Sequence, residues 1–442
     1  MSDKNIRLMP LYLPIFLEML FTMLTGVVDT FMLATEGDAA VGAVGTANSY
    51  ISVFLVMFTI ISSGMLAVMT QYIGAQKPHI AKQTLHLGLL INLGVGFAIT
   101  VLLCFFAEQI LNLVGVANDL RETAKIYMQT VGAFSICNAL IPIFSSYLRA
   151  FGNTATTLKA SVFANVTNII LNAVFLYGMK LGVFGIALAT GISRLLNLVW
   201  VWLASCKENH TNSTEKPLKN HVILSKVLQV GLPGALESVL YNLSVMIVIS
   251  FLNQMDSNGT QAIARAYAAQ IANFSLCAGC ALAQANSIIV GWRIGAGALD
   301  ECDRETRKSG IIAIALGGCT AGIFALFSRP ILGIFTQDAQ LISLISILLV
   351  IDIAVEIGRA VNMTFGFALK AAGDATYPML IGIVFMFLCA VGGTWYFGMQ
   401  LGWLAIGAYV GMALDECIRA LFMFLRWHKG IWRRINLISE TE

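Results

Sequence analysis

The sequence predicts an all-α polytopic membrane protein with twelve spans, arranged as two parallel repeats of six. Three observations predict this class. The 442-residue chain is 58% apolar and only 12% charged, with a mean hydropathy of +0.80, whereas a soluble globular chain carries roughly 25% charged residues. Long apolar blocks are separated by short breaks that contain charges, glycine or proline. Motifs of the first half also return in the second half at a nearly constant displacement.

The apolar blocks are long enough to cross a membrane as helices. A transmembrane helix needs roughly 20 apolar residues, and by that measure the chain contains about twelve spans. Runs rich in Leu, Ile, Val, Ala and Gly favour helices over the short alternating strands of a membrane barrel. The predicted spans are residues 8–33, 44–74, 84–107, 122–149, 157–179, 183–205, 223–252, 262–292, 308–328, 339–369, 376–398 and 403–425.

An internal repeat divides the chain into halves. LPIFLEML at 13–20 returns as LPGALESV at 232–239, and LRAFGNT at 148–154 returns as LKAAGDA at 369–375. The shorter motifs IGA at 73–75 and LG at 181–182 recur at 294–296 and 401–402, at nearly the same displacement. We therefore expect two six-span repeats that start on the same side of the membrane, related by a pseudo-twofold axis along its normal. Such a design places a central site between the halves and suits alternating access.

The repeat sets the expected domain organisation: an N-lobe over 1–205, a hydrophilic cytoplasmic linker over 206–222, and a C-lobe with a short basic tail over 223–442. Most Lys and Arg residues near span ends fall on the side that holds both termini, which predicts cytoplasmic termini. Nine dispersed cysteines and five histidines without ligand spacing predict neither a disulfide framework nor a metal site.

Polar residues form a stripe along the first predicted span. Glu18, Thr22, Thr25 and Asp29 share one helical face in an otherwise apolar segment. Glu18 and Asp29 lie roughly 16 Å apart along the axis, with Asp29 toward the outer leaflet. Burial disfavours the charged form of such an acid, and a proton or another cation restores neutrality. This chemistry suits ion-coupled transport, although a structural carboxylate bonded to Asn or Thr neighbours stays open.

Other spans repeat the pattern. Asn168 and Asn172 share a face of the fifth span with other polar residues, and Thr190 heads a polar face of the sixth. In the seventh span Glu237 and Tyr241 share a face, but Val248 stands where the first span has Asp29. The two halves therefore share an architecture without being chemically equal.

The second half carries charges of its own. Asp352, Glu356 and Arg359 share a face of the tenth span. Asp415, Glu416 and Arg419 lie within the twelfth span. Opposite charges three residues apart on a helix can pair, which lowers the cost of keeping them in a membrane. A structural ion-pair network and a second coupling or substrate site both remain open for these residues.

A family resemblance rests on motifs ordered along both repeats. Among them are VDTFMLATEGDAAVGAVGTA (28–47), LRAFGNT (148–154), NVTNIILNAVFLYG (165–178), LKAAGDATYP (369–378) and ALDECIRALFMFLRW (413–427). Single pieces are weak, but their order and spacing are specific. Over nearly its whole length the chain resembles the multidrug and toxic compound extrusion (MATE) transporters, and the last motifs are similar to one bacterial branch.

The resemblance implies a V-shaped pair of six-helix lobes and antiport, in which entry of H⁺ or Na⁺ drives export of organic, cationic or aromatic molecules. It places the main cation site at Asp29, with Asn168, Asn172 and Thr190 as partners. Some relatives have a second Asp at the position of Asn172. It also implies a multi-pass protein of the bacterial inner membrane without a cofactor beyond the coupling ion. We expect a monomer that binds no nucleic acid.

Glu18, Glu237, Tyr241, Asp352, Glu356 and Arg359 are our candidates for substrate binding or charge relay, and Asp415, Glu416 and Arg419 for structural ion pairs. Three other functions can be compared with antiport. A lipid-linked oligosaccharide flippase of the same superfamily would carry more basic charge in its cavity. A membrane-embedded enzyme such as a prenyltransferase would need clustered Asp motifs for Mg²⁺, and a primary pump would need a phosphate-binding loop. Neither motif is present.

Overall fold

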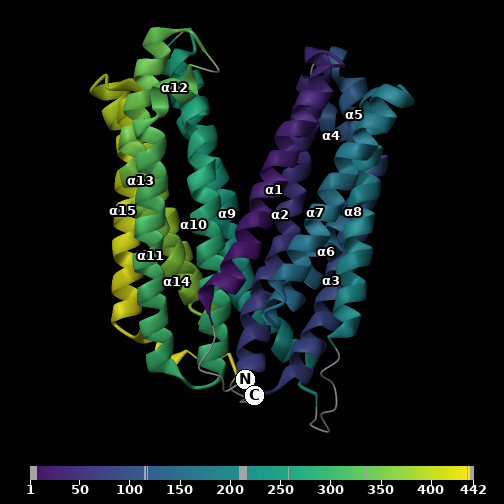
Figure 1. The fold of residues 1–442 in the computed structure, drawn as a ribbon, viewed down its shortest axis with the longest axis vertical. Helices are drawn as coiled ribbons and strands as arrows, with labels where there is room; N and C mark the ends of the chain where they lie inside the picture. Colours follow the sequence, from purple (N-terminus) through teal and green to yellow (C-terminus); the bar gives the residue numbers. More distant parts are fainter. Residues whose placement is uncertain are drawn as a thin grey trace. The chain divides into compact units, whose positions relative to one another are not determined.

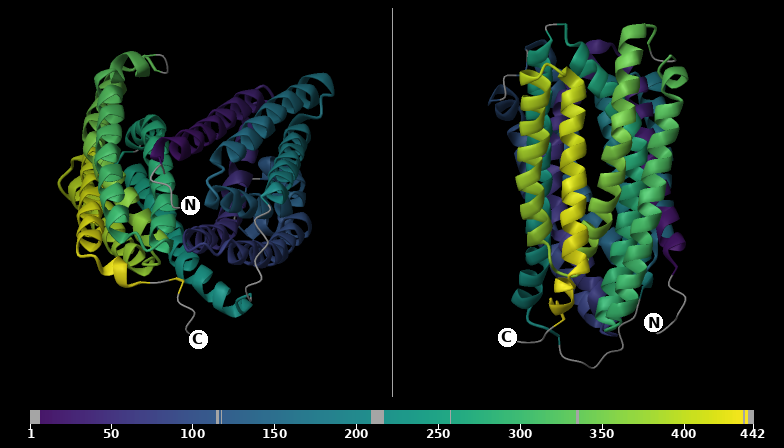
Figure 2. Two further views of the ribbon diagram at one scale, coloured as in Figure 1. Left: turned by 60° about the horizontal axis from the view of Figure 1, so that its bottom comes forward. Right: turned by 90° about the vertical axis from the view of Figure 1, so that its left-hand side faces the viewer.

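The computed structural model describes residues 7–113, 116, 118–208, 217–256, 258–333, 336–435 and 437–438, which form helices and turns without a β-strand. The chain divides into two compact units, built mainly on Met9–Gly231 and Leu232–Thr441. The predicted all-α class is confirmed. In the second unit the long helices α11, α13 and α15 lie side by side (Figures 1 and 2).

The first unit begins with three long helices and ends with α8. Its helices are α1 (Leu8–Ala34), α2 (Asp38–Gly74), α3 (Pro78–Phe105), α4 (Ala107–Leu113), α5 (Asn118–Ala133), α6 (Ser135–Ala150), α7 (Thr154–Ala173), the π-helical turn η1 (Val174–Gly178) and α8 (Gly182–Lys207).

The second unit has the same order of long and short helices. Its helices are α9 (Asn220–Met255), α10 (Thr260–Gly295), α11 (Leu299–Leu326), α12 (Ser328–Leu332), α13 (Ala339–Ala371), α14 (Thr376–Phe385), the π-helical turns η2 (Met386–Val391) and η3 (Thr394–Gln400), α15 (Leu404–His428) and the 3₁₀ turn η4 (Ile431–Arg434).

The boundary between the units lies inside α9. The first turns of this helix pack on the first unit, where Lys226 Nζ is 3.0 Å from the Tyr72 hydroxyl and Gln83 donates to Asn220 at 3.0 Å. The sequence predicts a linker over 206–222, whereas the boundary between the units lies after Gly231. Residues 209–216 of that linker lie outside the described residues.

Backbone conformation repeats with the sequence motifs. Gly152 and Gly373, which occupy the same place in the LRAFGNT and LKAAGDA motifs, both have positive φ angles, of 81° and 96°. Gly182 and Gly402 do so as well, at 57° and 71°. Glycine adopts this left-handed region without the steric cost that a side chain adds. Gly152 and Gly373 follow the ends of α6 and α13, and Gly182 and Gly402 lie in the turns that lead into α8 and α15, so the same turns recur in each half. Structure thus supports the repeat that the motifs predict.

Each predicted span coincides with helical structure. Among the described residues, ten helices are long and apolar enough to cross a membrane, and α5 with α6, bent by 46° at the break between them, counts as an eleventh if the pair is one span. The twelfth predicted span is α15, which carries Asp415, Glu416 and Arg419 near its middle and so falls short of the composition of the others. Several helices start earlier than predicted. For example, α11 begins at Leu299 because its charged first turns extend beyond the apolar block.

Candidate functional site

A chain of polar side chains links three helices of the first unit around Asp29. Asn172 on α7 is fully buried. Its Nδ2 donates to Asp29 Oδ1 on α1 at 2.7 Å and to Asn168 Oδ1 at 3.3 Å. Asn168 Nδ2 in turn donates to Thr190 Oγ1 on α8 at 3.4 Å. The structure therefore brings together all four residues that we proposed for cation coupling.

The local sequence explains why these groups meet. Asn168 and Asn172 are one helical turn apart, so both face the same neighbours, and the buried face of α7 also holds Ser161 and Asn165. By contrast, Thr22 and Thr25 of the predicted α1 stripe donate to carbonyl oxygens of their own helix, at 2.8 Å each. Within that stripe the acids, and not the threonines, connect to α7 through their side chains: Asp29 accepts from Asn172, and Glu18 accepts from Thr157.

The Asp29 cluster contains one oxygen without a donor. Asn172 Oδ1 is buried and has no hydrogen-bond partner among the described residues. A buried polar atom left without a partner costs free energy. A carboxylate next to an amide oxygen offers the oxygen ligands that hard cations prefer. The same pair could also hold a proton, since a protonated carboxyl group donates one hydrogen bond.

Two further groups lie near Asp29 that were not among the predicted site residues. The Arg194 guanidinium on α8 and the Tyr127 hydroxyl on α5 are both close enough to Asp29 for an electrostatic interaction. Tyr127 donates to Asn48 Oδ1 on α2 at 3.2 Å. A charged residue inside a span is itself a functional signal, so Arg194 could have been found from sequence, whereas no pattern marks Tyr127 or Asn48.

Glu18 and Glu237 form equivalent ion pairs in the two halves. Glu18 Oε1 lies 2.9 Å from an Arg149 nitrogen, and Glu237 Oε2 lies 2.6 Å from Lys370 Nζ. Both acids belong to the repeated LPxxLE motif, and both bases are the second residue of the repeated motif that contains the glycine turn. Glu18 also accepts from Thr157 at 3.0 Å. Each pair joins the first long helix of its repeat to the end of the helix before the glycine turn.

We expect Glu18→Gln and Glu237→Gln to weaken the fold by similar amounts. Each pair is only about four-fifths buried, with exposed fractions near 18% and 22%, so the loss should be about 1 kcal/mol in unfolding free energy. Thermal unfolding in detergent measures it, with the exposed Glu122→Gln as control. The charge swap Glu18→Arg with Arg149→Glu should recover stability. If the charge-swapped variant is destabilised as much as Glu18→Gln, the ion pair does not contribute to stability.

Six buried charges of the second unit form one network between α13 and α15. Arg359 on α13 contacts Glu356, and its Nε lies 3.3 Å from Glu416 Oε1. On α15 an Arg419 nitrogen lies 2.7 Å from Asp415 and 2.8 Å from Glu416. Asp352 is also buried and interacts electrostatically with Arg359. The two predicted charge clusters therefore meet through Glu416.

A glycine allows this contact. A Cβ atom at Gly358, next to Arg359, would lie 2.8 Å from the Cys417 nitrogen and 2.9 Å from the Glu416 carbonyl carbon. Both atoms belong to the α15 backbone, so the helices would have to separate. Close backbone approach at small residues is a common way for membrane helices to pack.

We therefore expect Gly358→Ala to destabilise the protein by about 1–3 kcal/mol, the usual cost of overpacking. The matched control is Gly366→Ala on the same helix, where nothing lies within 4 Å of the added atom. Ala is the better helix former, so this control should be neutral or stabilising. Thermal unfolding of both variants measures the difference, and equal melting temperatures would contradict the close approach.

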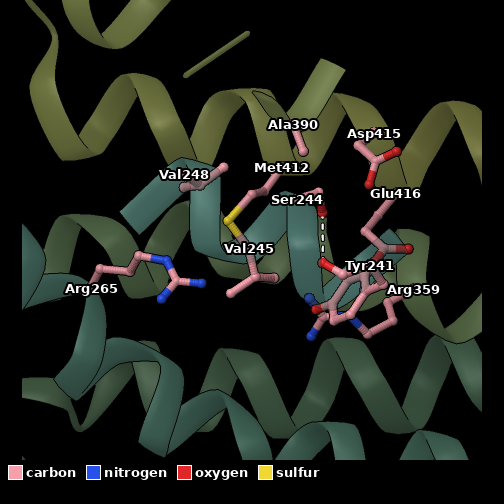
Figure 3. A pocket seen from close by; sticks show the side chains of 10 residues that line it. All are labelled: Tyr241, Ser244, Val245, Val248, Arg265, Arg359, Ala390, Met412, Asp415 and Glu416. Atoms are coloured by element: carbon pink, nitrogen blue, oxygen red, sulfur yellow. Dashed lines mark hydrogen bonds and ion pairs between the residues drawn. The ribbon is translucent and has the colours of Figure 1, made fainter. Parts of the chain in front are cut away.

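Two cavities adjoin the network. A cavity of about 390 Å³ is lined by residues that include Glu237, Tyr241, Arg359, Asn362 and Lys370. A smaller space of about 20 Å³ has room for roughly one water molecule. Figure 3 shows Arg265 at one end of the smaller space, and Arg359 with Asp415 and Glu416 at the other. The structure thus brings Glu237, Tyr241 and Arg359 to one cavity, while Glu18 lies in the other unit.

Comparison with known proteins matches the whole chain. A model of the MatE family matches residues 14–174 and 233–395, once in each half. The "Uncharacterized transporter YisQ" of Bacillus subtilis is 32% identical over 440 residues, covering 98% of this chain and 96% of its own. The "Probable multidrug resistance protein NorM" of Thermotoga maritima is 24% identical over 450 residues, covering 98% and 94%.

Solved structures share the fold. A MOP superfamily transporter from Pyrococcus furiosus has a TM-score of 0.88 at 19% identity, covering 97% of this chain and 96% of its own. An outward-facing multidrug resistance transporter of the MATE family has a TM-score of 0.88 at 20% identity, covering 98% and 96%. The predicted resemblance and the twelve-helix fold are confirmed by these matches.

Proposed function

Because the chain belongs to the MatE family of multi-pass membrane transporters, which are not enzymes, we propose that it is a secondary antiporter. In this proposal it exports organic, cationic or aromatic small molecules in exchange for H⁺ or Na⁺. The observation that carries the proposal is the polar chain from Asp29 through Asn172 and Asn168 to Thr190, which crosses three helices of an apolar bundle.

Asp29 is the proposed coupling residue. It is half-buried on the mostly apolar helix α1, and Arg194 supplies a positive charge nearby. Cation or proton binding at Asp29 would change the balance between these charges. It would also change one of the hydrogen bonds that join α1 to α7. One binding event would thus alter the packing of two helices, which is what coupling requires.

The ligands at Asp29 indicate how many ions, and of what charge, this site would bind. The cluster has one carboxylate with amide and hydroxyl oxygens, and Asn172 stands where some relatives carry a second acid. A single carboxylate with the free Asn172 oxygen supports binding of one monovalent ion. We propose that Asn168 and Thr190 position Asn172.

The substrate class rests on the second unit. Its cavity of about 390 Å³ has the size of a small-molecule site and combines apolar Met363, Phe367 and Met386 with two acids and three bases, which are Glu237, Glu416, Arg359, Lys370 and Arg419. The acids are ion-paired with these bases, so the support for an organic substrate comes from the apolar wall. Two relatives whose names include multidrug resistance are consistent with a broad range of organic substrates. We propose that this cavity contributes to binding, with Tyr241 as a ring surface.

We also propose that the protein acts as a monomer in the bacterial inner membrane with both termini in the cytoplasm. The excess of Lys and Arg on the side of the termini supports this orientation. Protease accessibility of a terminal tag in right-side-out and inverted vesicles would test it.

Efflux of a fluorescent organic cation from proteoliposomes tests the antiporter. Vesicles are loaded with the probe and given an inward gradient of H⁺ or of Na⁺. We expect one gradient to accelerate efflux, and that gradient names the coupling ion. If neither gradient moves any member of a broad cation panel, the antiporter proposal is wrong. Anionic and lipid-linked substrates would then test the flippase alternative.

A further inference from the structure

The first unit carries a groove that the proposed function does not use. It lies between the packed helices α7 and α8 and encloses about 480 Å³. Its apolar wall includes Phe163, Trp200 and Leu203, whose exposed fractions are 43%, 39% and 51%. The Phe163 and Trp200 rings lie 5.2 Å apart. Both helices are long and apolar enough to cross a membrane, so we expect this exposed wall to lie against lipid chains.

Two lysines stand at one end of this groove. Lys159 is the sixth residue of α7, and Lys207 is the last residue of α8. Both are exposed, and neither forms an ion pair with another of the described residues. The groove also contains Glu208, which accepts a hydrogen bond from Asn153 at 3.0 Å. The groove therefore has a positive end next to an apolar wall.

This arrangement has the polarity of a phospholipid site. Trp200 lies two helical turns before the end of α8, roughly 10 Å along the axis, and tryptophan is enriched at membrane interfaces. Lysine stems reach along apolar surface while their ammonium groups stay at the headgroup level. Basic pockets between transmembrane helices bind anionic lipid headgroups.

The second repeat does not reproduce this pair of lysines. Leu380 stands at the position that corresponds to Lys159 when the LRAFGNT and LKAAGDA motifs are aligned. Near the end of α15, Arg426 is ion-paired with Asp374 at 2.8 Å, and its guanidinium lies 4.5 Å from the Tyr377 ring centre. The repeat therefore gives a comparison in which the same helix pair lacks the pair of lysines.

From this geometry we propose that the groove between α7 and α8 binds one anionic phospholipid. Lys159 and Lys207 hold its phosphate. The acyl chains lie against Phe163, Trp200 and Leu203. The site is separate from Asp29 and from the proposed transport function.

Native mass spectrometry of the full chain in detergent tests the proposal. The protein is titrated with phosphatidylglycerol or with phosphatidylcholine of the same acyl chains. A lysine near a membrane surface contributes roughly fivefold to anionic lipid binding, so two lysines predict a preference of about 30-fold for the first phosphatidylglycerol. Lys159→Gln with Lys207→Gln should abolish this preference, and the corresponding pair of Arg substitutions should keep it.

The matched control is Lys308→Gln with Lys429→Gln, which removes the same charge from exposed positions of the other unit. The control should keep the preference. The proposal is overturned if the Lys159→Gln and Lys207→Gln double variant keeps the preference for phosphatidylglycerol, or if the control variant loses that preference equally. Displacement of the lipid by glycerol phosphate would also overturn it. As a second measurement on the native chain, phosphatidylglycerol with a photoreactive acyl chain should label peptides of α7 and α8. Labelling elsewhere alone would also overturn it.

Discussion

Asp29→Asn should abolish ion-driven efflux while leaving the protein folded. The substitution keeps the size of the side chain and its ability to accept from Asn172, but it removes the group that can take up a proton or a cation. Efflux of the fluorescent probe under the effective gradient should fall to the level of protein-free vesicles. The melting temperature in detergent should stay close to that of the native chain.

The control for this variant is Asp119→Asn, which neutralises an exposed acid at the start of α5. It should transport like the native protein. If Asp29→Asn keeps gradient-driven efflux, coupling lies elsewhere, and the buried acids of the second unit become the leading candidates. If both variants lose efflux together, the effect is not specific to the Asp29 cluster.

The largest effect on stability is expected for Arg419→Met. Arg419 is 4% exposed and contacts Asp415 and Glu416 at 2.7 and 2.8 Å. Removing the arginine leaves buried carboxylates without their main counter-charge, which typically costs about 3–5 kcal/mol. We expect a large drop in melting temperature in detergent and a low yield of monodisperse protein.

Two controls separate this network from ordinary ion pairs. Arg433→Met removes an arginine that lies 2.8 Å from Asp300, a residue whose side chain is 93% exposed, and should cost at most about 1 kcal/mol. Asp415→Leu combined with Arg419→Met should be more stable than Arg419→Met alone, because a buried carboxylate is removed with its partner. Equal effects of Arg419→Met and Arg433→Met would contradict the buried network.

Much of the fold could be predicted because a bilayer imposes strong rules on sequence. Backbone groups must bond internally, so long apolar runs predict helices, and a constant displacement between motifs predicts the repeat. The boundary inside α9 could not be predicted, because it depends on contacts such as the one between Lys226 and Tyr72. The break between α5 and α6 at Phe134 also has no signal in hydropathy.

The candidate site was partly predictable for a similar reason. Helical spacing places Asn168 and Asn172 on one face, and an acid in an apolar span draws attention to Asp29. The contacts between different helices could not be predicted in this way. Spacing within one helix does not show that Glu416 on α15 meets Arg359 on α13, or that Tyr127 approaches Asp29. Those contacts depend on how the helices pack. Gly358 is an example, because a side chain at this position would force α13 and α15 apart.

Reciprocal coupling tests the antiporter most directly. Sealed proteoliposomes receive an outward gradient of the organic cation with no initial ion gradient, and an internal indicator follows H⁺ or Na⁺. Antiport predicts that substrate leaving through the native protein drives one of these ions inward, and that Asp29→Asn shows no such ion entry. Substrate efflux through the native protein without movement of either ion would contradict ion-coupled exchange at Asp29.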